Sequence, residues 1–258
     1  MSIGRSKTRI GPGGPNSFTS NNYIFSEQAF QYQSAILAGG GTITYARLKL
    51  MDTKIFKPLV ASGDFALLDR LGVLANQNTE TALTDLKNFV VCSPVNSPTF
   101  TADRGYTGNG TSSYIDTLFN IGNSGFSGNN YSQNSASYGT FHTAAAGANS
   151  QRWIGATFNA EINLPAGPGF ASGCNSVNTS NTTVVWTNTA RGMKSANRTL
   201  STEFNMYIDG TLSANIPANN SSAIPLASVA TRTIKLLAWD NGGTVIAFCS
   251  GRLAAWFI

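Results

Sequence analysis

Beyond about residue 90, the chain shows no long helical periodicity and consists instead of short runs of β-branched and aromatic residues. Six such runs lie at 153–158, 182–187, 204–208, 233–239, 244–249 and 253–258. Clusters of Asn, Gly and Ser, which favour turns, separate them. Many short strands joined by uncharged turns are typical of two antiparallel sheets packed face to face. The sequence therefore predicts a mainly β fold, a two-sheet antiparallel sandwich.

One hairpin of this sandwich can be predicted in register. Asp209 and Gly210 form a turn signal, but a two-residue loop would mix apolar and polar residues on each face of the hairpin. A three-residue loop, 209–211, places Met206 opposite Ala214 and gives one wholly apolar face. We therefore predict the longer loop, in which Asp209 is a structural turn residue rather than a catalytic acid.

The surface must be polar but largely uncharged, because only 11% of the residues are charged, against roughly 25% in an average soluble domain. Hydrophobic residues make up 41%, too many for a disordered chain, and no run approaches the roughly 18 apolar residues of a membrane span. A chain of 258 residues can bury the core of one large domain. The net charge of +5 comes without the dense Lys/Arg stripe of a nucleic-acid binder. We therefore expect that the protein does not bind nucleic acid and has no membrane-spanning segment.

The N-terminal residues are predicted to form an extended arm. Glycines and prolines at 11–15 forbid a helix there, and the apolar residues of 1–25 are scattered. Arg5, Lys7 and Arg9 make the tip of the arm basic. Two interpretations stay open: a solvated arm, or an anchor in which these three residues dock on an acidic surface of a partner protein.

Two helices are expected after the arm. Ser26 is a plausible N-cap for a helix over 27–37, and apolar residues three and four apart predict a second helix over 44–62, with a kink at Pro58. A buried strand is expected over 65–74. The predicted organisation is an anchoring arm at 1–25, a helical segment packed on the sandwich at 26–63, and the β-sandwich at 64–258.

The cysteines and the N-terminus bear on the compartment. No apolar signal segment is visible before residue 25, so no export signal is expected. Cys92 and Cys249 follow apolar residues, which predicts buried, reduced thiols in a protein that folds in a reducing cytoplasm.

Three stretches resemble a known family. The segment FTADRGYTGNGTSSYIDT at 100–117 looks like the opening of the concanavalin A-like jelly-roll domain of tailed-bacteriophage and prophage structural proteins. NMYIDG at 205–210 is similar to a strand-and-turn element of laminin-G-like sandwiches, and FCSGRLAAWFI at 248–258 is similar to their closing strand. The resemblance covers about 44–258, whereas 1–25 match nothing in that family.

The resemblance implies a function as well as a fold. It implies a bacteriophage virion protein, made and folded in the host cytoplasm and displayed on the particle as a head decoration, a fibre-like protein or a tail-associated protein. The partners would be other capsid or tail proteins reached through the arm, other copies of the same chain in a homo-oligomer, and glycans of the host surface.

Catalysis is not expected. Glycoside hydrolases on this kind of fold need two carboxylates close together, and beyond residue 104 no two acids lie two or four residues apart. A hydrolase using Glu203 is the least favoured alternative. His142 lies in a stretch rich in Gly, Ala, Ser and Thr, where we expect a surface residue rather than half of a Cys–His pair. No cofactor is expected.

The alternative to a purely structural role is a carbohydrate-binding module or adhesin. Trp239, Asp240 and Asn241 combine an aromatic ring with carboxylate and amide groups, the composition of a sugar site. The competing interpretation is structural: Trp239 ends a core strand and the following residues turn the chain. Oxygen atoms of Asp240 and Asn241 also make calcium a candidate ligand.

Overall fold

The computed structural model describes residues 23–120, 130–132, 134–145, 151–156, 160–163, 171–173, 191–200, 203–216 and 232–258. Arg5, Lys7 and Arg9 of the predicted arm and the expected strand at 182–187 lie outside the described residues. Among the described residues, no helix is both long and apolar enough to cross a membrane.

The described chain begins with a helical segment at 27–67, and one further short helix follows the first strand. The helices are α1 (Glu27–Ala38), α2 (Tyr45–Met51), the π-helical η1 (Asp52–Phe56), α3 (Lys57–Ser62), α4 (Asp64–Leu67) and α5 (Thr79–Leu83). Both predicted helices are confirmed, and the Ser26 hydroxyl caps α1 by accepting the Ala29 N–H at 3.3 Å. The segments α2, η1 and α3 run on from one another, and Pro58, which has no N–H to donate, lies in the first turn of α3, directly after the π turn. The strand expected over 65–74 is shorter than predicted, because its first residues belong to α4.

Sixteen strands of the described chain form two sheets. They are β1 (Leu71–Val73), β2 (Ser93–Val95), β3 (Thr99–Thr101), β4 (Gly105–Thr107), β5 (Tyr114–Asn120), β6 (Ala136–Ala144), β7 (Arg152–Ala156), β8 (Ala160–Asn163), β9 (Ala171–Gly173), β10 (Gly192–Leu200), β11 (Glu203–Ile208), β12 (Thr211–Ile216), β13 (Thr233–Leu236), β14 (Trp239–Asn241), β15 (Thr244–Ile246) and β16 (Arg252–Phe257). The first sheet has the order β12-β11-β10-β6-β16-β4-β3, with β1 also paired to β16. The second has the order β15-β14-β7-β13-β5-β2, with β8 and β9 beyond β7.

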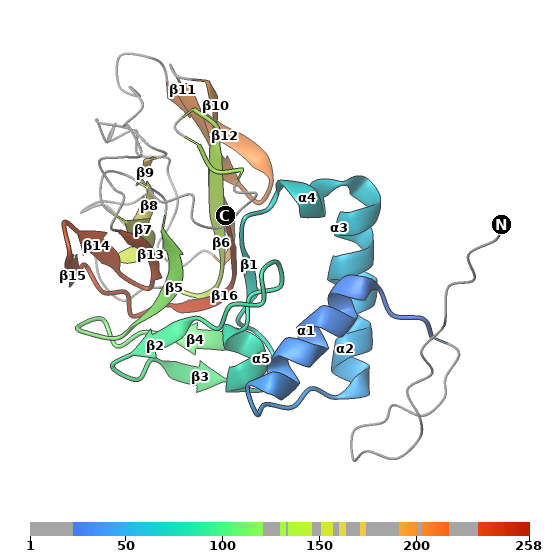
Figure 1. Cartoon of the computed structure of the whole chain (residues 1–258). Coiled ribbons are helices and arrows are strands. Elements are labelled where there is room, and N and C mark those ends of the chain that lie inside the picture. Colours follow the sequence, from blue (N-terminus) through green and yellow to red (C-terminus); the bar gives the residue numbers. More distant parts are fainter. Residues whose placement is uncertain are drawn as a thin grey trace.

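The two sheets pack face to face, which confirms the predicted sandwich (Figure 1). Their inner faces share one apolar core, to which the first sheet contributes Tyr138, Met206 and Trp256, and the second Ile115 and Ile154. The pairings are antiparallel except for the single contact of β14 with β7, which is parallel.

A layer of helices lies beside the first sheet and covers its β1 end (Figure 1). Leu71 and Val73 of β1 pack against a second apolar core, in which Tyr32, Ile36 and Phe56 are buried. The helices thus contact the first sheet through β1, and the division of the chain into a helical segment at 26–63 and a sandwich at 64–258 stays a prediction.

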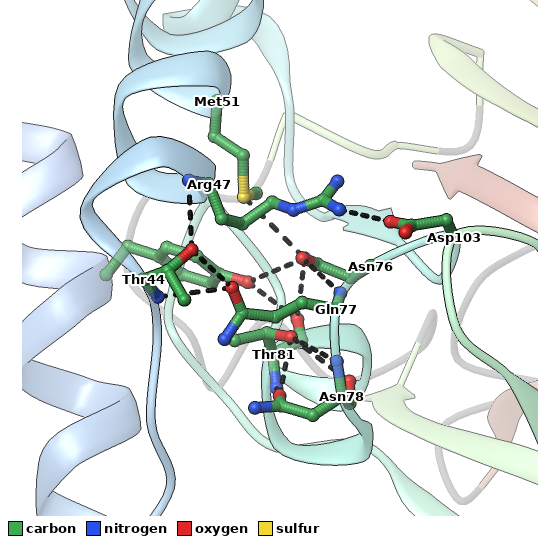
Figure 2. A network of polar contacts seen from close by, with 9 residues as sticks. Thr44, Arg47, Met51, Asn76, Gln77, Asn78, Thr81 and Asp103 are labelled. Carbon is green, nitrogen blue, oxygen red and sulfur yellow. Dashed lines mark hydrogen bonds and ion pairs between the residues drawn. The ribbon is translucent and has the colours of Figure 1, made fainter.

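Polar contacts join the helices to the loops of the sandwich (Figure 2). Arg47 of α2 forms an ion pair with Asp103 in the turn between β3 and β4. Thr44, the N-cap of α2, donates from its hydroxyl to the Gln77 side chain at 3.0 Å. Asn76 donates to the Thr81 carbonyl at 3.3 Å. The contacts of Arg47 and Thr44 thus tie α2 to the turn between β3 and β4 and to the segment before α5.

The hairpin of β11 and β12 differs from the prediction at its turn. Asp209 and Gly210 form a two-residue turn with φ of 49° and 78°, the left-handed values of a type I′ turn. A register shift after Met206 then restores the predicted pairing of Met206 with Ala214. Asp209 is a structural turn residue, as predicted, because its Oδ1 accepts the Met193 N–H of the neighbouring strand at 2.7 Å.

Candidate functional site

The predicted glycan site lies on β14, in the second sheet. Trp239 is partly exposed, its indole N–H donates to the Ala156 carbonyl at 3.0 Å, and the Arg152 guanidinium lies 5.3 Å from its ring centre. Asn241 is exposed. The indole N–H therefore already donates a hydrogen bond within the sheet and is not available to donate to a sugar hydroxyl.

Asp240 is buried and holds the turn that follows it. Its Oδ1 accepts the Gly243 N–H at 2.8 Å, and the Lys235 ammonium lies 4.0 Å from its Oδ2. Lys235 also pairs with Asp116 of β5 at 2.6 Å. These carboxylates thus belong to an ion cluster around one lysine, and a calcium ion at Asp240 stays a prediction. The contacts match the structural interpretation, and a glycan-binding role of Trp239, Asp240 and Asn241 stays a prediction.

His142 is buried in the sandwich, so its expected surface position is wrong. Alternation along β6 directs its side chain inward, where the imidazole stacks on the Trp153 indole with 3.7 Å between ring centres. Its Nδ1 lies 3.0 Å from the Lys194 Nζ, and its Nε2 lies 2.7 Å from the Thr140 hydroxyl. Burial, followed by the lysine charge, lowers the pKa of His142 well below its ordinary value.

The outer face of the first sheet carries a different set of side chains, ordered by the register of its strands. Ser195 of β10 lies opposite Gly139 of β6 on one side and Tyr207 of β11 on the other. Gly139 in turn lies opposite Phe257 of β16. This row, from Phe257 to Tyr207, places aromatic rings at both ends of a floor made of glycine and serine.

The adjacent row on the same face is polar. Ser137 of β6 lies opposite Asn197 of β10, and Asn197 lies opposite Asn205 of β11. All three side chains are partly exposed. The face therefore alternates an aromatic row with a row of hydroxyl and amide groups, and none of these residues is charged.

A pocket of about 450 Å³ lies where these rows meet the helical layer. We call it the outer-face pocket. On the sheet side it is lined by Ser135, Ser137, Asn197 and Phe257, and on the helical side by Asp64, Leu67, Leu68 and Asp69. A volume of this size accommodates one or two sugar rings or a molecule of similar bulk.

Each wall of the pocket has a defined chemistry. Leu67, which is 69% exposed, and the partly exposed Phe257 supply apolar surface to the lining. Asp69 is buried, and its two oxygens accept the backbone N–H groups of Asn130 at 2.6 Å and Tyr131 at 2.7 Å. Burial raises the pKa of Asp69, and these two hydrogen bonds oppose the rise. Asp69 thus fixes the 130–131 backbone at the pocket.

Sequence reasoning missed the outer-face pocket because its residues come from positions between 64 and 258 and form no local motif. Polarity does not mark the outer face either, because Lys194 and Arg198 of β10 are buried whereas Met193 is partly exposed.

Fold and pocket together define a β-sandwich protein with a pocket on the outer face of one sheet. No protein-family model and no curated protein sequence matches the chain. Solved structures that are similar include the CBM40 of the Ruminococcus gnavus IT-sialidase bound to α2,3-sialyllactose, at 10% identity and a TM-score of 0.38, over 64% of this chain and 88% of that chain.

The botulinum neurotoxin serotype D binding domain is also similar, at 11% identity and a TM-score of 0.46, over 75% of this chain and 48% of that chain. The same toxin's ligand-binding domain in complex with N-acetylneuraminic acid is 11% identical, with a TM-score of 0.40, over 75% and 46% of the two chains. This chain thus spans about half the length of the toxin domains. At these values the likeness concerns the fold alone.

Proposed function

We propose that this protein is a non-catalytic carbohydrate-binding protein and that the outer-face pocket is its binding site. The observation that carries the proposal is the combination of an apolar side chain and an aromatic ring, Leu67 and Phe257, with the hydroxyl and amide groups of Ser137 and Asn197 in one pocket. Sugars present C–H faces that pack on apolar groups and hydroxyls that need such polar partners.

The carboxylates of the pocket support binding rather than hydrolysis. Both oxygens of Asp69 already accept backbone N–H groups, so this group is not free to pass a proton to a glycosidic oxygen. The Asp64 Oδ2 accepts the Ser62 hydroxyl at 2.7 Å. A glycoside hydrolase needs one carboxyl group that is protonated and aimed at the substrate.

A glycan array tests the proposal with the full chain and four variants. Asn197→Ala and Leu67→Ala remove a polar and an apolar contact at the pocket and are expected to weaken binding at least roughly tenfold. Leu118→Ala, at an exposed leucine of the other sheet, is the matched control and is expected to bind as the parent protein does. Trp239→Ala tests the site predicted from sequence. Binding that is lost with Trp239→Ala but kept with Asn197→Ala would move the site to the second sheet.

A second candidate function is a structural role in a bacteriophage particle, which the resemblance of the sequence implies. The observation that favours attachment to a larger assembly is a set of exposed apolar side chains on the helices, among them Phe30, Leu37, Leu50 and Val60. The two functions are compatible, because none of these four exposed side chains lines the outer-face pocket.

The test of this second function is an inventory of purified particles by mass spectrometry. The chain is expected among the virion proteins. Deletion of residues 1–22, which keeps Tyr23 and Phe25 in their contacts with the helices, is expected to leave a folded protein that no longer joins the particle. Particles that lack the full-length chain would refute the structural role, and normal occupancy after the deletion would refute anchoring by Arg5, Lys7 and Arg9.

A further inference from the structure

The ionisable groups of the outer-face pocket all carry one sign of charge. Among the described residues that line it, Asp64 and Asp69 are ionisable, and none is lysine, arginine or histidine. Asp64 is exposed at the helical wall, where it faces solvent. Any ligand in the pocket therefore meets a negative potential.

Two cations lie near Asp69, and both are engaged with other groups. Lys87 and Arg70 lie close enough to Asp69 to oppose the burial-driven rise of its pKa. The Lys87 ammonium, however, donates to the Phe65 carbonyl at 2.5 Å, and Arg70 forms a fully buried ion pair with Asp85. Neither side chain lines the pocket, so neither is placed to receive a carboxylate of a ligand.

We propose that the outer-face pocket selects the uncharged terminal unit of a neutral glycan and discriminates against glycans that end in sialic acid or a uronic acid. This inference rests on the proposed function and names its ligand class. The sugar's C–H face packs on Phe257 and Leu67, while its hydroxyls bond to Asn197, Ser137 and the Asp64 carboxylate. An acidic sugar brings a like charge toward Asp64 and Asp69, with no cation among the described lining residues to pair with it.

The experiment measures binding of the full chain to pairs of glycans that differ only in their terminal unit. Each pair has a galactose-terminated glycan and the same glycan capped with sialic acid, and a second series ends in glucose or glucuronic acid. Binding is recorded at low and at physiological ionic strength. The variants are Asp64→Asn, which removes one charge and keeps an oxygen that can accept the Ser62 hydroxyl, and Glu27→Gln, the same change at an exposed acid on α1.

The parent protein is expected to bind the neutral member of each pair at least roughly tenfold more tightly. Asp64→Asn is expected to raise binding of the acidic members roughly threefold to tenfold, more at low salt, because like-charge repulsion is then less screened. Glu27→Gln is expected to leave the binding of both the neutral and the acidic glycans unchanged.

Two failures are distinguishable. Equal or tighter binding of the sialylated glycans, lost in Asn197→Ala, would overturn the neutral-ligand inference and leave the proposed function standing. Absence of binding to every glycan by the folded protein would overturn both.

Discussion

The ring of Phe257 covers the backbone of Gly139 on the neighbouring strand of the first sheet. A Cβ atom on Gly139 would overlap the edge of the Phe257 ring and would also lie 2.9 Å from the Ser195 Cβ. The ring rests where a side chain would otherwise stand, and its position forms one wall of the outer-face pocket. Glycine at 139 is thus required by the packing on the outer face.

Gly139→Ala is expected to push the Phe257 ring away from β6 and to change the shape of the pocket. Overpacking of this kind costs about 1–3 kcal/mol of unfolding free energy. Chemical denaturation measures the loss of stability, and the glycan array measures a loss of binding in the protein that remains folded. Gly210→Ala is the control in a turn far from any side chain: it is expected to strain the backbone without affecting glycan binding. Unchanged stability and binding of Gly139→Ala would show that the ring has room to move.

Stability is expected to fall from alkaline to acid pH because of the buried Lys194 and His142. Burial lowers the pKa of Lys194 to about 7, whereas an unfolded lysine keeps its proton up to about pH 10.4. Between these values the unfolded state binds more protons, so the free energy of unfolding rises with pH, by at most about 1.4 kcal/mol per pH unit. The lowered pKa of His142 adds a further loss below about pH 6.5.

Urea unfolding at pH 6, 7.5 and 9 measures this dependence. Lys194→Met keeps a long side chain without a titrating group, so its stability is expected to change much less between pH 7 and pH 9 than that of the parent protein. A parent protein whose unfolding free energy rises no more between pH 7 and 9 than that of Lys194→Met would contradict a lowered pKa of Lys194.

The ion pair of Arg70 and Asp85 is expected to matter greatly for stability. Both side chains are fully buried, and the Asp85 carboxylate also accepts the backbone N–H groups of Lys87, Asn88 and Val90. Asp85→Ala leaves a buried guanidinium without its counter-ion and is expected to lower the unfolding free energy by about 3–5 kcal/mol. Asp64→Ala, at an exposed acid on α4, is the control and is expected to cost less than about 1 kcal/mol. If Asp85→Ala and Asp64→Ala lowered the unfolding free energy equally, the ion pair of Arg70 and Asp85 would not be buried in solution.

The thiols of Cys92 and Cys249 are expected to be unreactive in the folded protein. Both are buried and free, and burial raises the pKa of each to about 12. Because the thiolate is the reactive form, iodoacetamide at pH 8 should modify neither residue before unfolding and both residues after it. Peptide mass spectrometry assigns the modified positions, and rapid alkylation of the folded protein at either cysteine would contradict the burial.

Local patterns in the sequence were sufficient for the two helical segments and for several strands near the C-terminus. Ser26 marks the start of α1, because a hydroxyl acceptor before a helix satisfies its first N–H groups. The strand β10 was not predicted, because its buried face carries Lys194 and Arg198 and therefore shows no apolar alternation. The turn after Ile208 was predicted one residue too long, because a register shift near Met206 restores the apolar face and no local pattern announces such a shift.

The sequence by itself thus determined a mainly β fold with few charges and with an N-terminal helical segment. The spacing of hydrophobic residues and the turn residues were sufficient for this, because both are local signals that extend over only a few positions. The tertiary structure decided where a ligand can bind. Phe257, Asn197 and Leu67 lie far apart in the chain, and only strand pairing and helix packing bring them to one pocket. The same packing buried His142 and committed Asp240 to its turn, because the surroundings of a polar side chain depend on which elements pack against it.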